Sequence, residues 1–204
     1  MSRRAVFALP WLVAAGLLTT AGLQAGGAAV SRDQAETFAR KVALIVQHGT
    51  TPSEAAARRR TTLTETEMNS WFAFRGARIL PAGVSSPSVS LMGNGRLTGV
   101  ATLDLEEIGR RRGRGGFDVF SLLGGQVPVT VTGVLHADQG RGRFELQEAA
   151  AGGVPVPKFL LQEVVSLYTR TADDPDGMSL ERPFDLPVNI RQIELGQGQA
   201  TVVQ

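Results

Sequence analysis

Cysteine is absent from this 204-residue sequence, and no other absence excludes as much. A chain without cysteine forms no disulfide and no thiolate metal site, and it has no cysteine nucleophile. There is also no leader cysteine that could carry a lipid. Any covalent staple, metal site or membrane attachment must therefore use other chemistry.

Histidine and the common catalytic motifs are also scarce. The two histidines, His48 and His136, are far apart in the sequence and form no local metal pair, so a zinc site would need distant carboxylates. The sequence contains no GxSxG elbow, P-loop or dinucleotide fingerprint. Glu65 and Glu67 are two residues apart on a predicted helix, which points them to different faces and argues against a pair of catalytic acids. We predict a protein that is not an enzyme and that holds no metal and no cofactor.

Positive charge is in slight excess, and the excess lies at the N-terminus. The whole chain has 21 basic and 19 acidic residues. Residues 1–30 contain two arginines and no acidic residue, so the rest of the chain has 19 of each. The sequence pI of about 9.6 therefore does not indicate a nucleic-acid partner, and we expect none.

The N-terminus has the pattern of an export signal. Arg3 and Arg4 precede an apolar run over residues 5–23, and small residues follow. Cleavage after Ala25, Ala28 or Ala29 fits the small-residue rule equally well. The run is also long enough, at about 20 residues, to stay as an uncleaved membrane anchor. Either alternative predicts an exported protein of the periplasm or cell envelope.

Residues 31–204 are expected to form a single domain, because this length suffices for one sizeable core. Aromatic residues make up only 6% of the chain, whereas glycine (24) and proline (10) are frequent. This composition is typical of a turn-rich protein with much strand and a core of aliphatic side chains.

Two helices are predicted in the first part of this domain. Ser31 can cap a helix that runs to about residue 47. Thr64 and Glu67 have the spacing of a capping box, and Leu63 and Met68 have the spacing of a hydrophobic staple. The second helix therefore begins at two independent local signals. It carries Trp71 and Phe72, which are interpreted either as core residues or as part of a ligand site.

Two hairpins are predicted to follow and to form an antiparallel sheet. Residues 88–92 and 96–106 alternate in hydrophobicity on either side of the turn Gly93-Asn94-Gly95. Residues 127–137 and 143–150 repeat this arrangement around a second turn.

Between the hairpins, residues 109–116 are predicted to form a flexible, arginine-rich loop. On an exported protein such a loop could contact anionic lipid headgroups. A solvated loop without a partner is the alternative. The candidate membrane-contact residues are Arg110, Arg111, Arg112 and Arg114.

Residues 155–170 form the best-defined amphipathic helix of the sequence, which we predict to be the core helix. Pro157 suits its first turn. Phe159 is the one large apolar residue on the polar side. The apolar side carries Leu160, Leu161, Val164, Val165, Leu167 and Tyr168.

The remaining residues are predicted to form a turn and two strands. The acidic stretch 172–177 superficially suggests a calcium loop but lacks the ligand spacing and the distal glutamate of an EF-hand, so a helix exit and turn explain it better. Residues 187–195 and 200–203 have the pattern of strands.

Three short motifs resemble the small bacterial proteins of the tubular lipid-binding (TULIP) type. They are LTExEhN at residues 63–69, hPVPxxLL at residues 154–161 and LPxxIxxIxhG at residues 186–196. The resemblance covers about residues 60–204. It implies an α+β fold in which a strongly curved antiparallel sheet wraps a long amphipathic helix and leaves an apolar groove for lipid chains. Small lipoproteins with a similar layout have an acylated cysteine, which this sequence does not have.

The resulting hypothesis is a non-enzymatic envelope protein that binds or carries a lipid, or another apolar ligand, between sheet and helix. The predicted lining is Trp71, Phe72, Leu103, Leu105, Val129, Val131, Phe159, Leu160, Val164 and Leu167. The alternative hypothesis is an envelope scaffold or interaction protein with a solid core, since periodicity does not distinguish a groove from a core. An envelope hydrolase is a third, weaker hypothesis.

Overall fold

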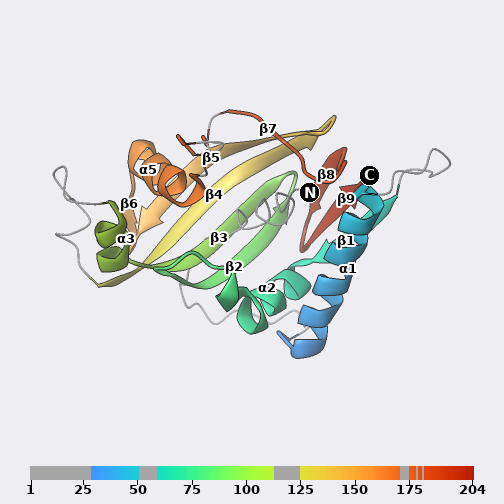
Figure 1. Cartoon of the computed structure of the whole chain (residues 1–204), viewed down its shortest axis with the longest axis horizontal. Coiled ribbons are helices and arrows are strands. Elements are labelled where there is room, and N and C mark those ends of the chain that lie inside the picture. The colour runs from blue at the N-terminus through green and yellow to red at the C-terminus, as the bar shows by residue number, and fades with distance from the viewer. Residues whose placement is uncertain (1–28, 51–58, 113–124, 171–174, 178, 181) are drawn as a thin grey trace.

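The computed structural model describes residues 29–50, 59–112, 125–170, 175–177, 179–180 and 182–204. In these residues two antiparallel sheets, four α-helices and one short 3-10 helix are present (Figure 1).

The larger sheet has six strands. Its hairpin turns, Asn94-Gly95 and Gln139-Gly140, have positive φ at both central residues, as two-residue hairpin loops require. Both predicted hairpins are confirmed. The strand order is β2 (Val84–Gly93), β3 (Arg96–Asp104), β4 (Gln126–Asp138), β5 (Arg141–Ala151) and β6 (Val154–Pro155), and β7 (Phe184–Asp185) pairs with the other end of β5.

The smaller sheet joins segments that are far apart in the sequence. Its order is β1 (Arg60–Thr64), β9 (Gln199–Val203) and β8 (Gln192–Gly196). Arg60 on β1 forms an exposed ion pair with Glu194 on β8, and the hydrogen bond from Arg60 to Glu194 raises the pKa of the Arg60 guanidinium. Thr62 and Thr201 share a hydrogen bond of 3.2 Å between their hydroxyls. The last two predicted strands thus pair with each other, and β9 also pairs with β1, in a sheet separate from the larger one.

Helices α1 (Arg32–Thr50) and α2 (Glu65–Phe74) pack against each other, and α2 also packs on β2. The predicted capping box is confirmed, because Thr64 Oγ1 accepts from the Glu67 N–H and the Glu67 carboxylate accepts from the Thr64 N–H. A 3-10 helix, η2 (Gly76–Arg78), follows α2. These helices and both sheets enclose one core cluster that includes Phe38, Ile45, Leu63, Met68, Phe72, Val89, Leu91, Leu97, Leu195 and Val202.

The predicted α+β class with antiparallel sheets is confirmed, but the finer architecture differs. Neither sheet is strongly curled, and strand pairing is divided between two sheets. The predicted core helix is the short α5 (Lys158–Thr169), and none of its described residues belongs to the core cluster. Residues 155–157, which were predicted to be helical, precede α5. Pro155 pairs with β5 next to Val154, and the residue before a proline, here Val156, is sterically disfavoured in the helical conformation.

Two local predictions are also corrected. Strand β3 ends at Asp104, and α3 (Leu105–Arg112) occupies the first part of the predicted flexible loop. The Asp104 carboxylate accepts from the Glu107 N–H at 3.0 Å and so caps α3, while acidic residues in its first turn and arginines in its last suit the helix dipole. Residues 187–190 form a turn, so the predicted strand 187–195 begins only at Gln192.

Side chains of α2 cover the outer edge of β2. The Asn69 amide donates to Val89 O at 2.8 Å and accepts from Val89 N at 2.7 Å, as a neighbouring strand would. The Glu65 carboxylate accepts from Leu91 N at 2.7 Å. An uncovered edge strand is a template for unwanted pairing, so these contacts protect the sheet as well as attach the helix.

We therefore expect Asn69→Ala to lower the free energy of unfolding by about 2 kcal/mol, because it leaves a part-buried N–H and C=O of Val89 without partners. Urea unfolding of the variant measures this loss. Thr66→Ala on the same helix is the control and should change stability by less than about 0.5 kcal/mol. Equal stability of the two variants would show that the amide contacts contribute nothing.

Candidate functional site

The six-stranded sheet has one apolar and one polar face. Residues directly opposite each other in an antiparallel pair lie on the same face. On the polar face, Thr98 and Thr132 share a hydroxyl hydrogen bond of 3.0 Å, and Glu148 is opposite Thr132. The register places three rows on the apolar face: Leu103 with Val127, Ala101 with Val129 and Ala151, and Gly99 with Val131 and Ala149.

This apolar face continues beyond the core cluster. Of the residues on β2 and β3, Val89, Leu91 and Leu97 belong to the core cluster. None of the residues named in the three rows belongs to it. We call these rows the distal face: Gly99, Ala101, Leu103, Val127, Val129, Val131, Ala149 and Ala151. Half of its members are glycine or alanine. Gly99, Ala101, Val129 and Ala149 are buried, and the other four are half-buried.

Four of the ten predicted lining residues lie at or next to the distal face. Leu103, Val129 and Val131 belong to it, and Leu105 is buried directly after β3 at the start of α3. From α5, which contacts β5, Leu160 and Val164 are half-buried and Val165 is buried. Figure 1 shows α5 beside the end of β5 that carries β6. Leu167 belongs to α5, but its side chain lies outside the described residues.

The polar side of α5 is held by the segment that follows it. Gln162 donates to Ser166 Oγ at 2.9 Å and accepts from Leu180 N at 2.8 Å. Gly177 approaches so closely that a Cβ there would lie 2.9 Å from Ser166 Cα. The helix is therefore fixed from outside, and its position over β5 does not depend on its apolar side alone.

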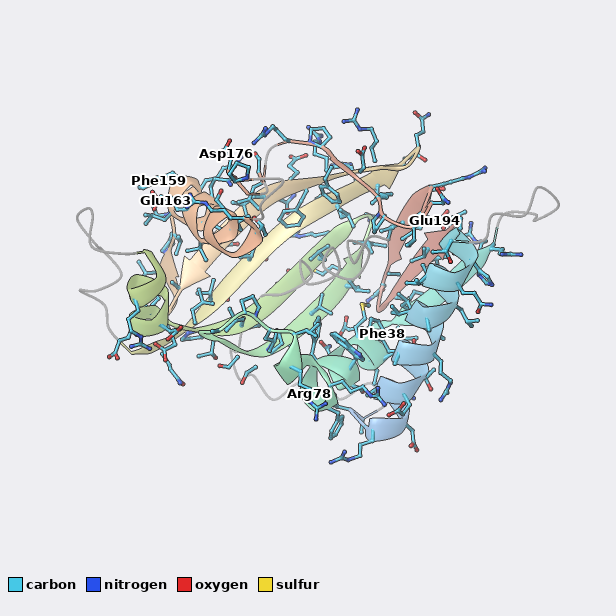
Figure 2. The ribbon with its side chains drawn as sticks, viewed as in Figure 1. Phe38, Arg78, Phe159, Glu163, Asp176 and Glu194 are labelled. Atoms are coloured by element: carbon cyan, nitrogen blue, oxygen red, sulfur yellow. The ribbon has the colours of Figure 1, made fainter. Side chains whose placement is uncertain are left out.

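Phe159 lies apart from the rest of the predicted lining. It is exposed on the first turn of α5, and Figure 2 shows it on the outer side of the helix. Val154 on β6 is exposed as well. Both are apolar, and neither is covered by the described part of the chain.

Trp71 and Phe72, predicted near a groove mouth, lie in and against the core cluster. Phe72 is buried, and the Trp71 ring centroid lies 5.6 Å from those of both Phe38 and Phe72. The structure thus separates these two aromatic residues from the α5 side chains.

The predicted membrane-contact arginines lie on and after α3. Arg110 is exposed and pairs with Glu107 at 2.6 Å and with Glu106 at 3.9 Å. The hydrogen bond to Glu107 raises the pKa of Arg110, which keeps this side chain cationic. Arg111 and Arg112 are in α3 with side chains outside the described residues, and Arg114 lies outside them altogether.

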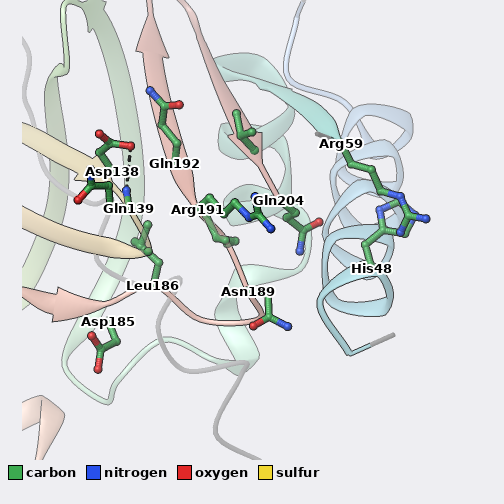
Figure 3. A pocket seen from close by; sticks show the side chains of 13 residues that line it. His48, Arg59, Asp138, Gln139, Asp185, Leu186, Asn189, Arg191, Gln192 and Gln204 are labelled. Carbon is green, nitrogen blue, oxygen red and sulfur yellow. Dashed lines mark hydrogen bonds between the residues drawn. The ribbon is translucent and has the colours of Figure 1, made fainter. Parts of the chain in front are cut away.

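A polar cleft of about 850 Å³ was not anticipated from the sequence. It lies between the end of α1, the β4–β5 turn and residues 185–192, and Figure 3 shows Asp138 and Asp185 on one side and His48 and Arg59 on the other. His48 Nδ1 is buried without a hydrogen-bond partner in the described part of the chain. Since both signs of charge line the cleft, its geometry favours no single ligand charge.

One wall of the cleft is a strained turn. Ile190 N donates to Pro187 O at 3.1 Å, and both residues between them, Val188 and Asn189, have positive φ (48° and 55°). Asparagine tolerates this conformation, whereas a β-branched valine rarely adopts it. Gln204 fixes the turn by donating to Val188 O at 2.8 Å. The sequence pattern predicts a strand here, because Val188 and Ile190 suit a strand, although the turn residues Pro187 and Asn189 flank Val188.

No protein-family model, no curated protein and no solved structure matches this chain. The resemblance to the tubular lipid-binding proteins therefore stays a prediction. Within the described residues, no helix is long and apolar enough to cross a membrane.

Proposed function

We propose that this chain is a non-enzymatic envelope protein that holds an apolar ligand, such as a lipid acyl chain, between the distal face and α5. The observation that carries this proposal is the continuation of the sheet's apolar face beyond the core cluster, with glycine or alanine at half of its positions. Burying aliphatic surface contributes about 25 cal/mol per Å², so such a face favours an apolar occupant.

The dimensions of the distal face suit a chain-like ligand. Its rows extend over four residue steps of about 3.4 Å and its three strands over two spacings of about 4.8 Å, which gives about 14 Å by 10 Å. The half-buried Leu160 and Val164 would form the wall on the β5 side. The TULIP resemblance supports a lipid among apolar ligands, and the N-terminal sequence supports the envelope location.

The rival interpretation is a scaffold protein in which protein side chains fill this interface. Native mass spectrometry of the protein, purified without detergent and followed by lipid extraction, separates the two hypotheses. A co-purifying lipid, or uptake of a fluorescent fatty acid, is expected. Absence of both would leave the scaffold hypothesis as the better one.

Val164→Trp is expected to abolish uptake of the fluorescent fatty acid and to change the free energy of unfolding by less than about 1 kcal/mol, because the added ring enters the ligand space. In a filled interface the same change should cost about 1–3 kcal/mol through overpacking. Glu163→Trp is the matched control, because Glu163 directly precedes Val164 on α5 and is exposed. This variant should still take up the fatty acid.

A further inference from the structure

Three exposed, large apolar side chains lie at one end of the domain. Val30, Phe74 and Ile79 are 50%, 42% and 40% exposed, and they come from the residues just before α1, the end of α2 and the residue after η2. The two helix ends are tied together, since Ser31 N donates to Ser70 Oγ at 3.1 Å. We call these three side chains the N-terminal patch.

Arginines surround the N-terminal patch. The Arg32 guanidinium lies over the Phe74 ring at 5.1 Å from its centroid. Arg78 is exposed beside Ile79 and has no carboxylate partner among the residues that the structure describes, and Figure 2 shows it at this end of the molecule. Arg75 pairs with Glu36. Among residues 30–36 and 70–79 of the described chain, Arg32, Arg75 and Arg78 stand against Asp33 and Glu36.

The sequence places an apolar segment directly before this patch. Residues 5–23 form the apolar run, and seven steps separate residue 23 from Val30. An extended chain spans at most about 3.5 Å per residue, so Val30 lies within about 25 Å of the end of that run. A bilayer that holds the run therefore has Val30, and with it the N-terminal patch, tethered within reach of its surface.

We propose that the N-terminal patch rests on an anionic lipid bilayer, with Phe74 and Ile79 among the headgroups and Arg32 and Arg78 facing anionic lipids. Aromatic and branched aliphatic side chains flanked by arginines have the composition of an interfacial contact. Each arginine near an anionic surface contributes attraction that salt weakens. This orientation does not depend on a ligand at the distal face.

The absence of cysteine makes the test clean, because one introduced cysteine carries the only label. The full chain with Ile79→Cys, labelled with an environment-sensitive fluorophore, is reconstituted into phosphatidylcholine vesicles with and without phosphatidylglycerol. A blue shift and quenching by lipid-attached quenchers are expected with phosphatidylglycerol. Leu44→Cys and Met92→Cys, at sites that are 47% and 52% exposed, are matched controls and should show neither.

Two further variants complete the test: a charge reversal at Arg78 and a label at Phe159 on α5. Arg78→Glu in the labelled Ile79→Cys chain should weaken quenching by more than about fivefold, because the lost arginine contact alone accounts for about fivefold and the glutamate adds repulsion. Quenching at Ile79 equal to that at Leu44 overturns the proposal. So does quenching of a Phe159→Cys label in place of the Ile79 label, because it would turn the α5 end towards the bilayer. Fatty-acid uptake is measured separately and is unaffected by either outcome.

Discussion

Replacing Gly49 with alanine is expected to lower the free energy of unfolding by about 4 kcal/mol, although alanine is the better helix former. Gly49 is buried in the last turn of α1, against the strained turn at residues 187–190. A Cβ at this position would overlap the Val188 carbonyl oxygen and lie 2.6 Å from Val188 Cβ. The obstacle is mainly backbone, which cannot rotate away as a side chain could.

The clash also breaks hydrogen bonds that join α1 to the end of the chain. Asn189 Nδ2 donates to Gly49 O at 2.7 Å, and Gln204 Nε2 donates to both Ile45 O and Val188 O at 2.8 Å. Moving the turn away from α1 would strain or break all three, each with a net contribution of about 1 kcal/mol. The cleft wall would move with the turn.

Thermal and urea unfolding of Gly49→Ala measure this effect, which corresponds to a fall in Tm of roughly 10 °C for a chain of this size. Gln47→Ala is the control on the same helix turn, where the side chain is exposed. It should leave stability within about 0.5 kcal/mol of the wild type. A Gly49→Ala variant as stable as Gln47→Ala would mean that the turn yields without cost.

Local signals predicted the elements whose determinants lie within a few residues of each other. The capping box needs only Thr64 and Glu67, and the first hairpin needs only Asn94 and Gly95 between alternating runs. The hydrogen bonds that stabilise these elements join residues of the same short segment, so the local sequence is enough to predict them. The motif at residues 63–69 is accounted for by this capping box and by the contacts of Glu65 and Asn69 with β2.

Partners over long sequence distances could not be predicted. β1 pairs with β9 across more than 130 residues, and Gly49 meets Val188 across a similar span. Periodicity shows that a segment has an apolar face but does not show what covers that face. The sequence pattern therefore identified α5 as amphipathic, while its place beside β5 and outside the core cluster depends on the pairing of β6.

The same limit applies to the candidate site, because the sequence shows which residues are apolar but not which distant residues they meet. Leu103, Val129 and Val131 were predicted to line one interface, and the register places them on the same face of the sheet. Trp71 and Phe72 were assigned to a mouth by residue type alone, and packing on Phe38 places them in the main core. The cleft was missed because its wall is a turn whose first central residue, Val188, is β-branched and rarely adopts a positive φ.

Replacing Lys41 with methionine is expected to lower the free energy of unfolding by about 3 kcal/mol. Lys41 Nζ lies 2.7 Å and 2.9 Å from the two carboxylate oxygens of Glu67 and also donates to Thr62 O at 2.7 Å. The Glu67 side chain is only 6% exposed, against 30% for Lys41. Removing the lysine leaves a buried carboxylate without its counter-charge, which typically costs 3–5 kcal/mol, and the partial exposure of Lys41 favours the lower end.

A double-mutant cycle with Glu67→Gln identifies the origin of this loss. The Glu67→Gln amide can still accept from the Thr64 N–H, so the capping box is kept while the negative charge is removed. Glu67→Gln alone should lower the free energy of unfolding by about 1–2 kcal/mol, because it leaves a part-exposed Lys41 ammonium that still donates to Thr62 O. If the unpaired carboxylate dominates, the double variant Lys41→Met/Glu67→Gln should be more stable than Lys41→Met alone by at least about 1 kcal/mol, although it lacks both charges. A double variant as unstable as the sum of the two single variants would instead place the effect of Lys41 in its bond to Thr62 and in the packing of its stem against α2.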